Sequence, residues 1–509
     1  MHKLIFAAVL TAYCFLSTAT IKAETTTKKA NKHWTILVFL NGDNDLEGAA
    51  MGDMNEMERA VDTSKYNVIV EFDRSPFGDV SNGNWSDTRT FYVTPDPSVD
   101  KIIRSTIIDS GFEANMGDPN ALIDFVKKGI QDYPADNYML VVWDHGNGWL
   151  KKQNRLPLKG ISYDETSNRE MGVANGEYAY AIDSISALLG KRLDVFANDA
   201  CLMGMQEVAY EVKDNVSCLI SSELSIAYDG YPYDDILNWL NVNQNATPEE
   251  LSNAIVDKYT ISYNGGSQGT QDATLSALKL DNEFLHLSHC IDAFAVELIK
   301  IKGRNNTNIE TAYTETQCFD NSWVYSYDIY DFAYNIKQNV NISDSIKSWA
   351  DSVMLAIDSV VINEGHCSTP PALLEGSHGI AIYYPVGFNI DTTYKNLTLS
   401  KDLPNWMNFI KGDTLGIEEI SNIKYQSASG GSKLEIIKNK ICLSVPNNYY
   451  TNTRITIYDL CGRTKEIVYS GVLSKGDYVF TPKIKKSGIY FVRLKTNSGF
   501  YTQKLIITR

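Results

Sequence analysis

The chain has 509 residues, 44% hydrophobic and 21% charged, which is typical of folded globular protein and leaves room for more than one domain. Its formal net charge of −16 argues against nucleic acid as a partner and suits cationic substrates. None of the eight cysteines stands in a CxxC-type pair, so their spacing predicts neither a disulfide framework nor a zinc site.

The first residues have the form of a signal peptide. A basic start precedes an apolar stretch over residues 4–21, and the small Ala23 offers a cleavage point. We therefore predict a leader over residues 1–23 and an exported protein, secreted or on the cell surface after a periplasmic stage. No later segment reaches the roughly 18 apolar residues that a membrane-spanning helix needs, so no membrane span is expected.

Strand and helix patterns alternate beyond the leader. A strand pattern over residues 34–40 is followed by a helical pattern that ends at residue 60. Further short apolar strands are predicted over residues 67–72, 89–93, 138–143, 193–197, 217–221 and 273–279. Helical patterns separate most of them, over residues 119–131, 177–189, 203–212, 248–263 and 282–301. This alternation predicts an α/β fold with a mostly parallel sheet covered by helices on both faces.

The composition changes towards the C-terminus. The last elements before the change are helices over residues 329–336, 342–362 and 404–411 and a strand over residues 379–384. Residues 412–432 are polar and rich in Ser and Gly, which is typical of a linker. Residues 433–509 contain only strand-like runs and predict a small antiparallel β-sandwich. The predicted domains are therefore residues 24–411 and residues 433–509.

Two of the buried strand patterns end at reactive side chains. The run over residues 138–143 leads to His145, and the run over residues 193–197 leads to Cys201. Because substrates bind at the carboxyl ends of parallel strands, imidazole and thiol are expected side by side. A thiol attacks an amide as the thiolate, and an imidazole can take its proton and later protonate the leaving amine. These residues predict a cysteine hydrolase, with the backbone amides of Gly146 and Cys201 as oxyanion donors.

Each of these residues also has a structural interpretation when it is taken alone. Cys201 fits a buried apolar thiol, and His145 fits a loop residue. The hydrolase prediction rests on the two residues occurring together, each at the end of an apolar strand.

Three short stretches resemble one peptidase family. Asp-His-Gly-Asn-Gly-Trp over residues 144–149, Asp-Ala-Cys-Leu-Met-Gly over residues 199–204 and Asn-Gly-Asp-Asn-Asp-Leu-Glu over residues 41–47 resemble the clostripain family, in the clan of caspases, legumains and gingipains. The resemblance extends over residues 34–411 in the order of elements. It implies a caspase-like α/β/α sandwich and an endopeptidase that cuts protein or peptide substrates after Arg or Lys and requires no cofactor.

Specificity for a cationic side chain requires a carboxylate in a partly buried pocket. Asp199 lies two residues before Cys201, as the pocket acid of the family does, and Asp229 matches a second pocket acid in position. The alternative for Asp199 is a cap for a helix that starts near Leu202. The alternative for Asp229 is an ordinary turn residue.

The stretch between the His and Cys segments contains several basic residues. Enzymes that this chain resembles are often zymogens cut by their own activity, which makes Lys159 the first candidate for self-cleavage and Arg155 the second. The alternative is that both are ordinary solvated side chains in a polar loop.

Calcium is a further candidate ligand. Asp43, Asp45 and Glu47 alternate as at the start of a cation-binding loop, but Met54 stands where the EF-hand pattern has its final Glu. The pattern favours acids that cap the following helix, so no metal ligand is assigned.

The C-terminal module has a resemblance of its own. Residues 455–459, 488–494 and 503–507 resemble the sorting domains of the bacterial type IX secretion route, which implies its machinery as a partner. A sandwich that binds glycan or packs on the catalytic domain is the alternative. For the whole chain, the alternatives are a gingipain- or legumain-like peptidase of different specificity and a catalytically inactive surface adhesion protein.

Overall fold

The computed structural model describes residues 32–76, 78–150, 160–370, 373–385, 387 and 390–412, and in the C-terminal module residues 433–437, 440–445, 451–458, 464–473, 476–486, 488–496 and 499–507. The predicted leader, the predicted linker from residue 413 onwards and the predicted cleavage positions Arg155 and Lys159 lie outside the described residues. No helix in the part that the structure describes is long and apolar enough to span a membrane.

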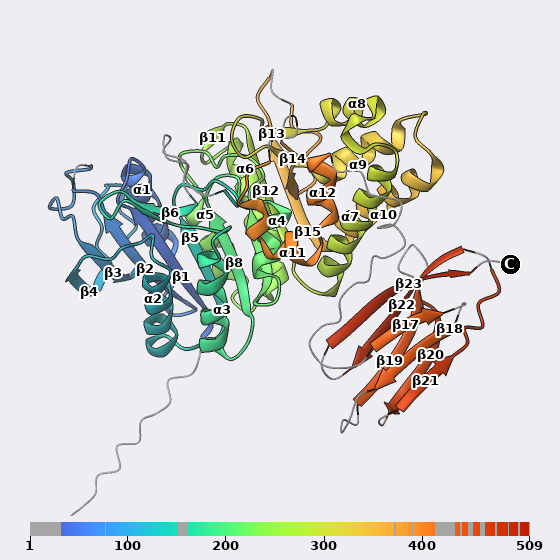
Figure 1. The fold of residues 1–509 in the computed structure, drawn as a ribbon. Helices are drawn as coiled ribbons and strands as arrows, with labels where there is room; N and C mark the ends of the chain where they lie inside the picture. Colours follow the sequence, from blue (N-terminus) through green and yellow to red (C-terminus); the bar gives the residue numbers. More distant parts are fainter. Residues whose placement is uncertain are drawn as a thin grey trace, which may run out of the picture. The chain divides into compact units, whose positions relative to one another are not determined.

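A large mixed sheet forms the centre of the main domain (Figure 1). Within the described residues it has nine strands, in the spatial order β15 (Val361–Cys367), β12 (Ala273–Lys279), β9 (Val216–Ser221), β8 (Leu193–Asp199), β5 (Ala135–Trp143), β1 (Lys32–Gly42), β2 (Asn67–Arg74), β3 (Thr88–Tyr92) and β4 (Thr106–Phe112). The strands from β9 to β2 pair in parallel, and the pairs at both edges are antiparallel. The predicted mostly parallel sheet is confirmed, with antiparallel additions at its edges.

Helices cover both faces of this sheet. One face packs against α1 (Glu47–Ala60), α5 (Tyr233–Val242) and α6 (Pro248–Tyr263), and the other against α2 (Pro119–Asp132), α3 (Glu177–Leu189), α4 (Gln206–Val212) and α7 (Asn282–Lys300). Along β1, Leu37 belongs to one apolar core and its neighbour Val38 to the other. A strand that is buried on both faces has a continuous apolar sequence, which is why the pattern of β1 was recognisable.

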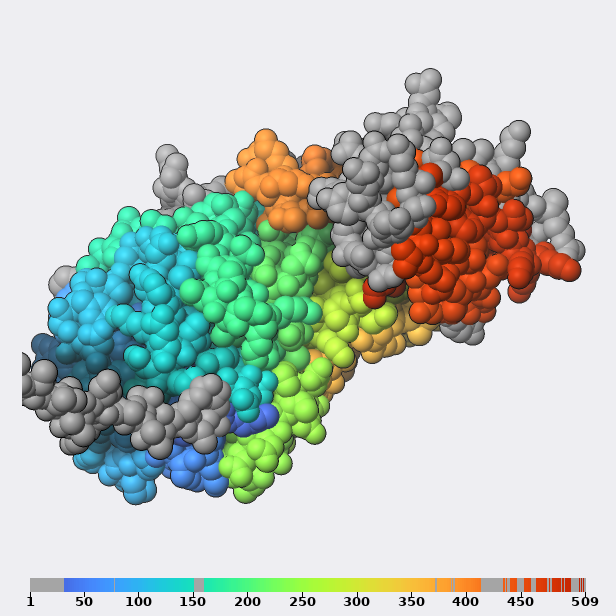
Figure 2. Space-filling view, turned by 90° about the horizontal axis from the view of Figure 1, so that it is seen from below, coloured from blue at the N-terminus to red at the C-terminus, as the bar shows by residue number. Residues whose placement is uncertain are grey.

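Further helices, hairpins and a small sheet complete the main domain. They are the helices α8 (Thr307–Glu315), α9 (Ile329–Gln338), α10 (Asp344–Val360), α11 (Thr398–Asp402) and α12 (Asn405–Lys411), the hairpins β6 (Ile161–Asp164) with β7 (Arg169–Met171) and β10 (Asn264–Gly266) with β11 (Gly269–Thr270), and the small sheet of β13 (Cys318–Asp320), β14 (Ser326–Asp328) and β16 (Ala381–Tyr383). Figure 2 shows the last segment of the domain, in orange, against the green residues of the middle of the chain. There the Thr398 backbone N–H donates to Glu211 Oε1 at 2.5 Å, which ties α11 to α4 behind the Cys201 segment.

The structure differs from the predicted elements in several places, and the helices α5 and α8 were not predicted at all. The helix predicted over residues 342–362 ends at Val360, and Val361 begins β15 opposite Leu278 of β12. β-branched residues favour this strand pairing over another helical turn. The helix predicted over residues 203–212 begins only at Gln206. The prediction missed β4 because its residues are mostly exposed and form no apolar run.

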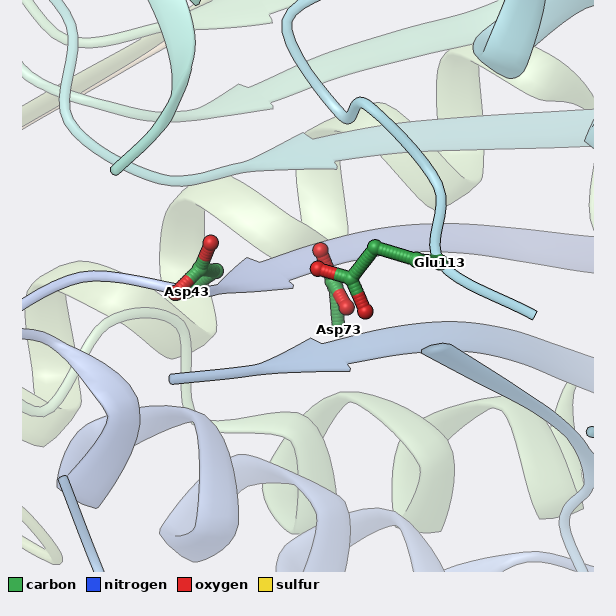
Figure 3. A group of neighbouring side chains, drawn as sticks. All are labelled: Asp43, Asp73 and Glu113. Carbon is green, nitrogen blue, oxygen red and sulfur yellow. The ribbon is translucent and has the colours of Figure 1, made fainter. Parts of the chain in front are cut away.

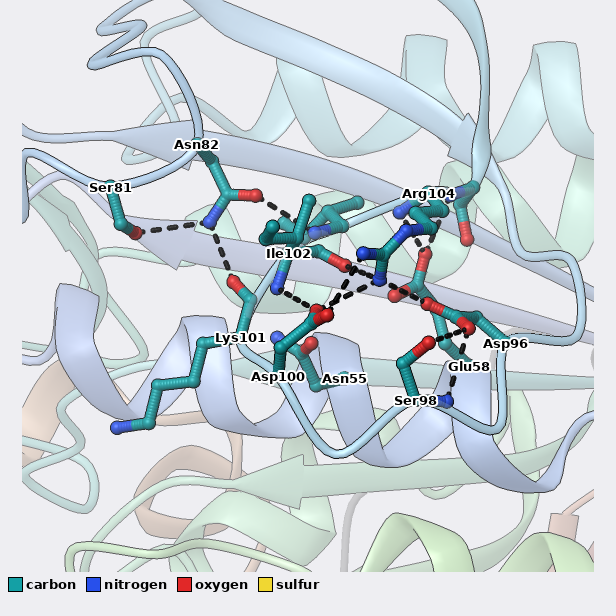
Figure 4. A network of polar contacts seen from close by, with 12 residues as sticks. Asn55, Glu58, Ser81, Asn82, Asp96, Ser98, Asp100, Lys101, Ile102 and Arg104 are labelled. Atoms are coloured by element: carbon teal, nitrogen blue, oxygen red, sulfur yellow. Dashed lines mark hydrogen bonds and ion pairs between the residues drawn. The ribbon is translucent and has the colours of Figure 1, made fainter.

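Polar contacts fix the loop between β3 and β4 to α1 (Figure 4). Glu58 on α1 accepts a hydrogen bond from the Arg104 backbone N–H at 2.8 Å, and the Arg104 guanidinium lies 2.7 Å from Asp96 and 2.8 Å from Asp100. Asn82, in the loop after β2, bonds the same segment with both ends of its side-chain amide. These hydrogen bonds and ion pairs therefore fix the loops at the carboxyl end of β2.

The C-terminal module contains two antiparallel sheets. One consists of β17 (Lys433–Ile437), β18 (Lys440–Val445) and β21 (Gly476–Phe480), and the other of β20 (Thr464–Leu473), β19 (Thr451–Tyr458), β22 (Gly488–Thr496) and β23 (Gly499–Ile507). Leu443 and Val445 from the first sheet share one apolar cluster with Ile455 and Val492 from the second. The predicted small antiparallel β-sandwich is confirmed.

Candidate active site

The strands β5 and β8 lie side by side in the middle of the sheet and end at the same level. They pair in parallel with Trp143 opposite Asp199, and the Asp144 backbone N–H donates to the Asp199 carbonyl at 3.2 Å. His145 and Cys201 each follow two residues after the Trp143–Asp199 pair. The sheet therefore carries the two predicted catalytic residues at neighbouring positions of its carboxyl edge, where substrates bind in this class of fold.

Gly146 packs its backbone directly against the Cys201 segment. A Cβ at this position would lie 2.5 Å from the Cys201 carbonyl oxygen and 2.9 Å from both the Cys201 nitrogen and the Ala200 Cβ. Only glycine permits this approach of two backbones. Gly146 also forms an isolated antiparallel bridge with Ile161, so the loop after β5 is bound on two sides.

The Cys201 thiol is partly buried against the loop that follows β9. Its Sγ lies 3.9 Å from the Ile226 carbonyl oxygen. Burial raises the pKa of the thiol, and hydrogen bonds with the Ile226 backbone and the Ser225 side chain, followed by the Gly146 backbone, oppose this rise. The resting thiol is therefore protonated at neutral pH and needs a base before it can attack. Leu202 follows with a φ of 61°, a strained conformation for a non-glycine residue that its surroundings must enforce.

The loop after β1 holds the His145 side of the site. His145 Nε2 lies 2.7 Å from Asp45 Oδ1, and the imidazole is 31% exposed. The Asp144 carboxylate accepts hydrogen bonds from the side chains of Asn41 at 2.9 Å and Asn44 at 2.8 Å. The Asp45 contact engages Nε2 of the imidazole, so Nδ1 is the ring nitrogen that remains for a second partner. The sequence analysis missed Asp45 as a partner of the imidazole, although the polar run after the first strand was its signal.

Asp199 is a buried carboxylate at the end of β8. Its Oδ2 accepts from the Tyr231 backbone N–H at 3.1 Å and the Tyr233 hydroxyl at 2.9 Å, whereas its buried Oδ1 has no hydrogen-bond partner within the described residues. Burial raises the pKa of Asp199 to about 7. Asp199 does not cap the following helix, because α4 begins at Gln206 with Met205 as its N-cap. The bare Oδ1 could accept a hydrogen bond from a cationic ligand.

A second buried acid, which the sequence analysis missed, lies beside Asp199. Asp53 on α1 accepts a hydrogen bond from Trp143 Nε1 at 2.7 Å. A Cβ on Gly230 would lie 3.0 Å from Asp53 Oδ2 and 3.1 Å from Asp199 Oδ2, so both carboxylates adjoin the same glycine. Burial, followed by the charge of Asp199, raises the pKa of Asp53. The sequence gives only a weak signal for Asp53, because it is a single acidic residue among the apolar residues of one helix.

Asp229 lies outside this buried pair. It is an exposed residue of the turn in which the Gly230 backbone N–H donates to the Ala227 carbonyl at 3.0 Å. Its charge nevertheless contributes to the raised pKa of Asp53, after burial and the charges of Asp199 and Glu56. The structure therefore places Asp229 outside the buried pair but close enough to Asp53 for its charge to act on it.

An open hollow of about 450 Å³ adjoins the thiol. Its lining includes residues 224–227, residues 270–272 and Thr369. Ile226 belongs to this lining and also contacts Cys201 Sγ through its carbonyl oxygen. The loop that contacts the thiol therefore also forms part of the wall of this hollow.

The acidic residues after β1 diverge and form no single cation-binding loop. Asp45 turns to His145, and Glu47 pairs with Arg74, whose Nε lies 2.5 Å from Glu47 Oε1. The helix-cap interpretation is wrong, because α1 has Leu46 as its N-cap and no capping side chain. Asp43 instead lies with Asp73 and Glu113 in a separate group of acids (Figure 3).

The chain is described again from residue 160, directly after the predicted cleavage positions. The isolated bridge to Gly146 involves Ile161, the first residue of β6. The backbone N–H groups of Glu165 and Thr166 donate to the Asp43 carbonyl and side chain, both at 2.9 Å. The segment that follows Lys159 therefore packs against the loops on both sides of His145.

Comparison with known proteins gives consistent matches. A family model described as the clostripain family matches residues 38–411. Clostripain of Hathewaya histolytica is 27% identical over 427 residues, which cover 74% of this chain and 79% of the relative. The secreted C11 cysteine protease iotapain of Bacteroides thetaiotaomicron has a TM-score of 0.55 at 14% identity, covering 73% of this chain and 99% of that chain. A structure described as an inactive zymogen C11 protease from Parabacteroides distasonis has a TM-score of 0.52 at 19% identity, covering 74% and 99%.

Proposed function

The chain belongs to the clostripain family and is a cysteine endopeptidase, and from this premise we propose that it cleaves peptide bonds after Arg or Lys with Cys201 as nucleophile and His145 as acid and base. One observation carries the proposal. Two adjacent parallel strands end in register, and each delivers one of these residues two positions later. The likeness of the fold to the solved C11 protease structures supports the same assignment.

The reaction begins with the protonated thiol. His145 Nδ1 takes the Sγ proton, while Asp45 holds Nε2 and stabilises the imidazolium that forms. Sγ then bonds to the substrate carbonyl carbon, and the π electrons of the carbonyl move to its oxygen. The backbone amides of Gly146 and Cys201 donate to this oxyanion.

The tetrahedral intermediate collapses when the oxyanion electrons re-form the carbonyl and the C–N bond breaks. His145 gives its proton to the leaving amine. Water, deprotonated by His145, then attacks the thioester and releases the thiol. The chemistry needs only the thiol, the imidazole and water, so no cofactor enters these steps.

The preference for a cationic side chain is assigned to the two buried acids. Asp199 offers its bare Oδ1, and Asp53 adds a second carboxylate beside the same glycine. An Arg or Lys side chain would replace the repulsion between these acids by two attractive contacts. Asp229 adds negative charge at the rim.

Self-activation is the second part of the proposal. Cleavage after Lys159, or after Arg155, would leave a new chain end next to Ile161, which pairs with Gly146. A Cys201→Ala protein that is made pure should stay uncut, and a protein of this kind that still splits into two chains would overturn self-cleavage.

Export is the third part. We assign residues 1–23 to a leader and the C-terminal sandwich to type IX sorting, and relatives in the family are described as secreted. Deletion of residues 433–509 should leave an active enzyme in the periplasm, whereas unchanged export would contradict the sorting role.

Peptide hydrolysis tests the central proposal. Substrates that differ only in Arg, Lys or Asn at the cut are offered to wild type, Cys201→Ala and a control, Cys442→Ala, whose thiol lies in the C-terminal module. We expect Arg and Lys turnover that survives in the control and disappears in Cys201→Ala. Preferential Asn turnover would favour a legumain-like specificity. No turnover of any substrate, even after trypsin treatment to open the Lys159 region, would favour an inactive binding protein.

A further inference from the structure

The loop over residues 222–227 follows β9 and contacts the segment that carries the thiol. Its Leu224 carbonyl accepts the Leu202 backbone N–H at 3.1 Å. The carbonyl oxygen of Ile226 lies 3.9 Å from Cys201 Sγ. The position of the 222–227 loop therefore determines the immediate surroundings of the thiol.

One side chain of this loop turns into the protein interior. Glu223 is 1% exposed, and its Oε2 accepts the Gly379 backbone N–H at 3.1 Å. Gly379 precedes β16, and its own carbonyl accepts the hydroxyl of Ser276 in β12 at 2.6 Å. The Glu223 carboxyl therefore ties the 222–227 loop to a segment that the central sheet holds in place.

Two further acids lie at the same glycine. The His378 backbone N–H donates to Asp328 Oδ2 at 2.7 Å, so the backbone N–H groups of two consecutive residues bind Asp328 and Glu223. A Cβ on Gly379 would lie 3.3 Å from Glu364 Cγ. Three carboxyl groups from distant parts of the chain are therefore neighbours here.

The only ion-pair partners of these acids among the described residues are two imidazoles. His378 Nδ1 lies 3.4 Å from Asp328 Oδ1, and His366 Nδ1 lies 2.9 Å from Glu364 Oε1. Hydrogen bonding to Glu364 raises the pKa of His366. Burial opposes protonation of His378, but its contacts with Asp328 outweigh burial and raise its pKa. Neither imidazole forms an ion pair with Glu223.

Glu223 lacks the donors that a buried carboxylate needs. Its Oε1 is buried and has no hydrogen-bond donor within the described residues. Asp328, in contrast, accepts backbone N–H groups on both oxygens, from Asp331 at 2.7 Å and from His378. Burial, followed by the charges of Asp328 and Glu364, raises the pKa of Glu223. A proton on Glu223 removes the repulsion and gives the pair a hydrogen bond.

We propose that Glu223 is a positioning residue that works in its protonated form, donating a hydrogen bond to Asp328 and so holding the 222–227 loop against the Cys201 segment. Loss of this proton at alkaline pH would leave buried carboxylates side by side and displace the loop. The effect on rate rests on the proposed function, because it acts through Cys201. The proton on Glu223 does not depend on catalysis.

The pH dependence of kcat/KM for an Arg peptide tests this role. Glu223→Ala should lower kcat/KM by up to about 100-fold even at neutral pH, because the loop loses its anchor and the thiol shifts. Glu223→Gln should restore activity at neutral pH, because its amide can donate to Asp328 and accept from Gly379. It should also lack the alkaline fall in activity that Glu223 causes in wild type.

Two further variants make the test specific. Glu58→Gln is the matched control, because burial raises the pKa of Glu58 as well, but Glu58 bonds the loop between β3 and β4. It should keep the wild-type pH profile. Glu364→Gln, at a partly exposed position of the edge strand β15, removes a negative charge that keeps the proton on Glu223. It should move the alkaline fall to lower pH, and it carries the test if Glu223→Gln does not fold.

Urea unfolding separates this proposal from the proposed peptidase, and it is measured in the Cys201→Ala background from acid to alkaline pH. The folded parent keeps a proton on Glu223 that the unfolded chain releases at about pH 4. This proton makes the parent less stable as pH rises. Glu223→Gln has no such proton, so its unfolding midpoint should rise relative to that of the parent as pH increases.

Three results would overturn the proposal. The first is an alkaline fall in kcat/KM that Glu223→Gln and Glu364→Gln leave unchanged. The second is a folded Glu223→Gln protein that is inactive at neutral pH, which would make the ionised carboxylate the working form. The third is a midpoint difference between Glu223→Gln and its parent that does not change with pH. If wild type cleaves no peptide, the peptidase proposal fails, and the urea measurements still decide whether Glu223 holds the proton.

Discussion

One added methyl group at Gly146 tests how closely the two strand ends must pack. In Gly146→Ala the new Cβ would lie 2.5 Å from the Cys201 carbonyl oxygen, whereas ordinary contact begins at 3.4 Å. The segments must therefore separate by about 0.9 Å, and backbone atoms cannot swing aside as a flexible side chain can. Overpacking of this kind costs about 1–3 kcal/mol of stability, and a displacement near 1 Å at reacting atoms costs about 100-fold in rate.

The assay compares kcat/KM for an Arg peptide with the free energy of unfolding in urea. Gly52→Ala is the matched control, because it adds the same methyl group to α1 at a position with nothing within 4 Å. The control should keep its activity and gain up to about 1 kcal/mol of stability from better helix propensity. If Gly146→Ala keeps both wild-type turnover and wild-type stability, the backbone of residue 146 does not pack against Cys201, and its role as oxyanion donor loses its geometric basis.

Four further results are expected. Asp199→Asn should lower kcat/KM for Arg and Lys peptides by about 30-fold or more, since loss of one partner of a buried charge pair costs about 2 kcal/mol or more; an unchanged rate would exclude it from the pocket. Because burial raises the pKa of Asp199 to about 7, KM for an Arg peptide should fall as pH rises through 7 in wild type and stay flat in Asp199→Asn. Asp45→Ala should lower kcat about tenfold, shift the pH–rate profile and leave KM unchanged, as expected of a residue that positions His145, and a change in KM alone would contradict that role. Asp73 keeps a proton in the folded state up to about pH 9 that the unfolded chain releases near pH 4, so the free energy of unfolding should fall as pH rises between these values. Urea unfolding at several pH values checks this, and a free energy that rises over that interval would refute it.

The sequence could predict the central strands because the fold buries them on both faces. β5 and β8 have continuous apolar runs, and the residues that follow them stand out as the first polar side chains. That local pattern is enough to select His145 and Cys201. It also misled the prediction near residue 361, where an apolar run continues from α10 into β15 and only pairing with β12 separates the two elements.

The acids of the pocket and the cluster of Asp43, Asp73 and Glu113 could not be predicted in the same way. Asp53 meets Asp199 only because α1 packs across the end of the sheet beside Gly230. Asp73 and Glu113 are separated in the sequence by the strands β3 and β4, and they meet Asp43 only in the folded chain. Neither group has a characteristic spacing in the sequence, because its members come from different elements. What the members share is burial of a carboxylate oxygen without a hydrogen-bond donor, which only the folded structure shows.

The loop after β1 connects the acid cluster at the end of β2 with the active-site imidazole. In a parallel sheet this loop lies between the ends of the neighbouring strands, here β2 on one side and β5 on the other. Asp43 turns to the acids at the end of β2, and two residues later Asp45 turns to His145 beyond the end of β5. A shift of Asp43 is therefore transmitted to the imidazole through only two residues of backbone. A change at the acid cluster should consequently alter the position of the imidazole, and the Asn41 side chain, which bonds both the Asp43 backbone N–H and the Asp144 carboxylate, supports the same coupling.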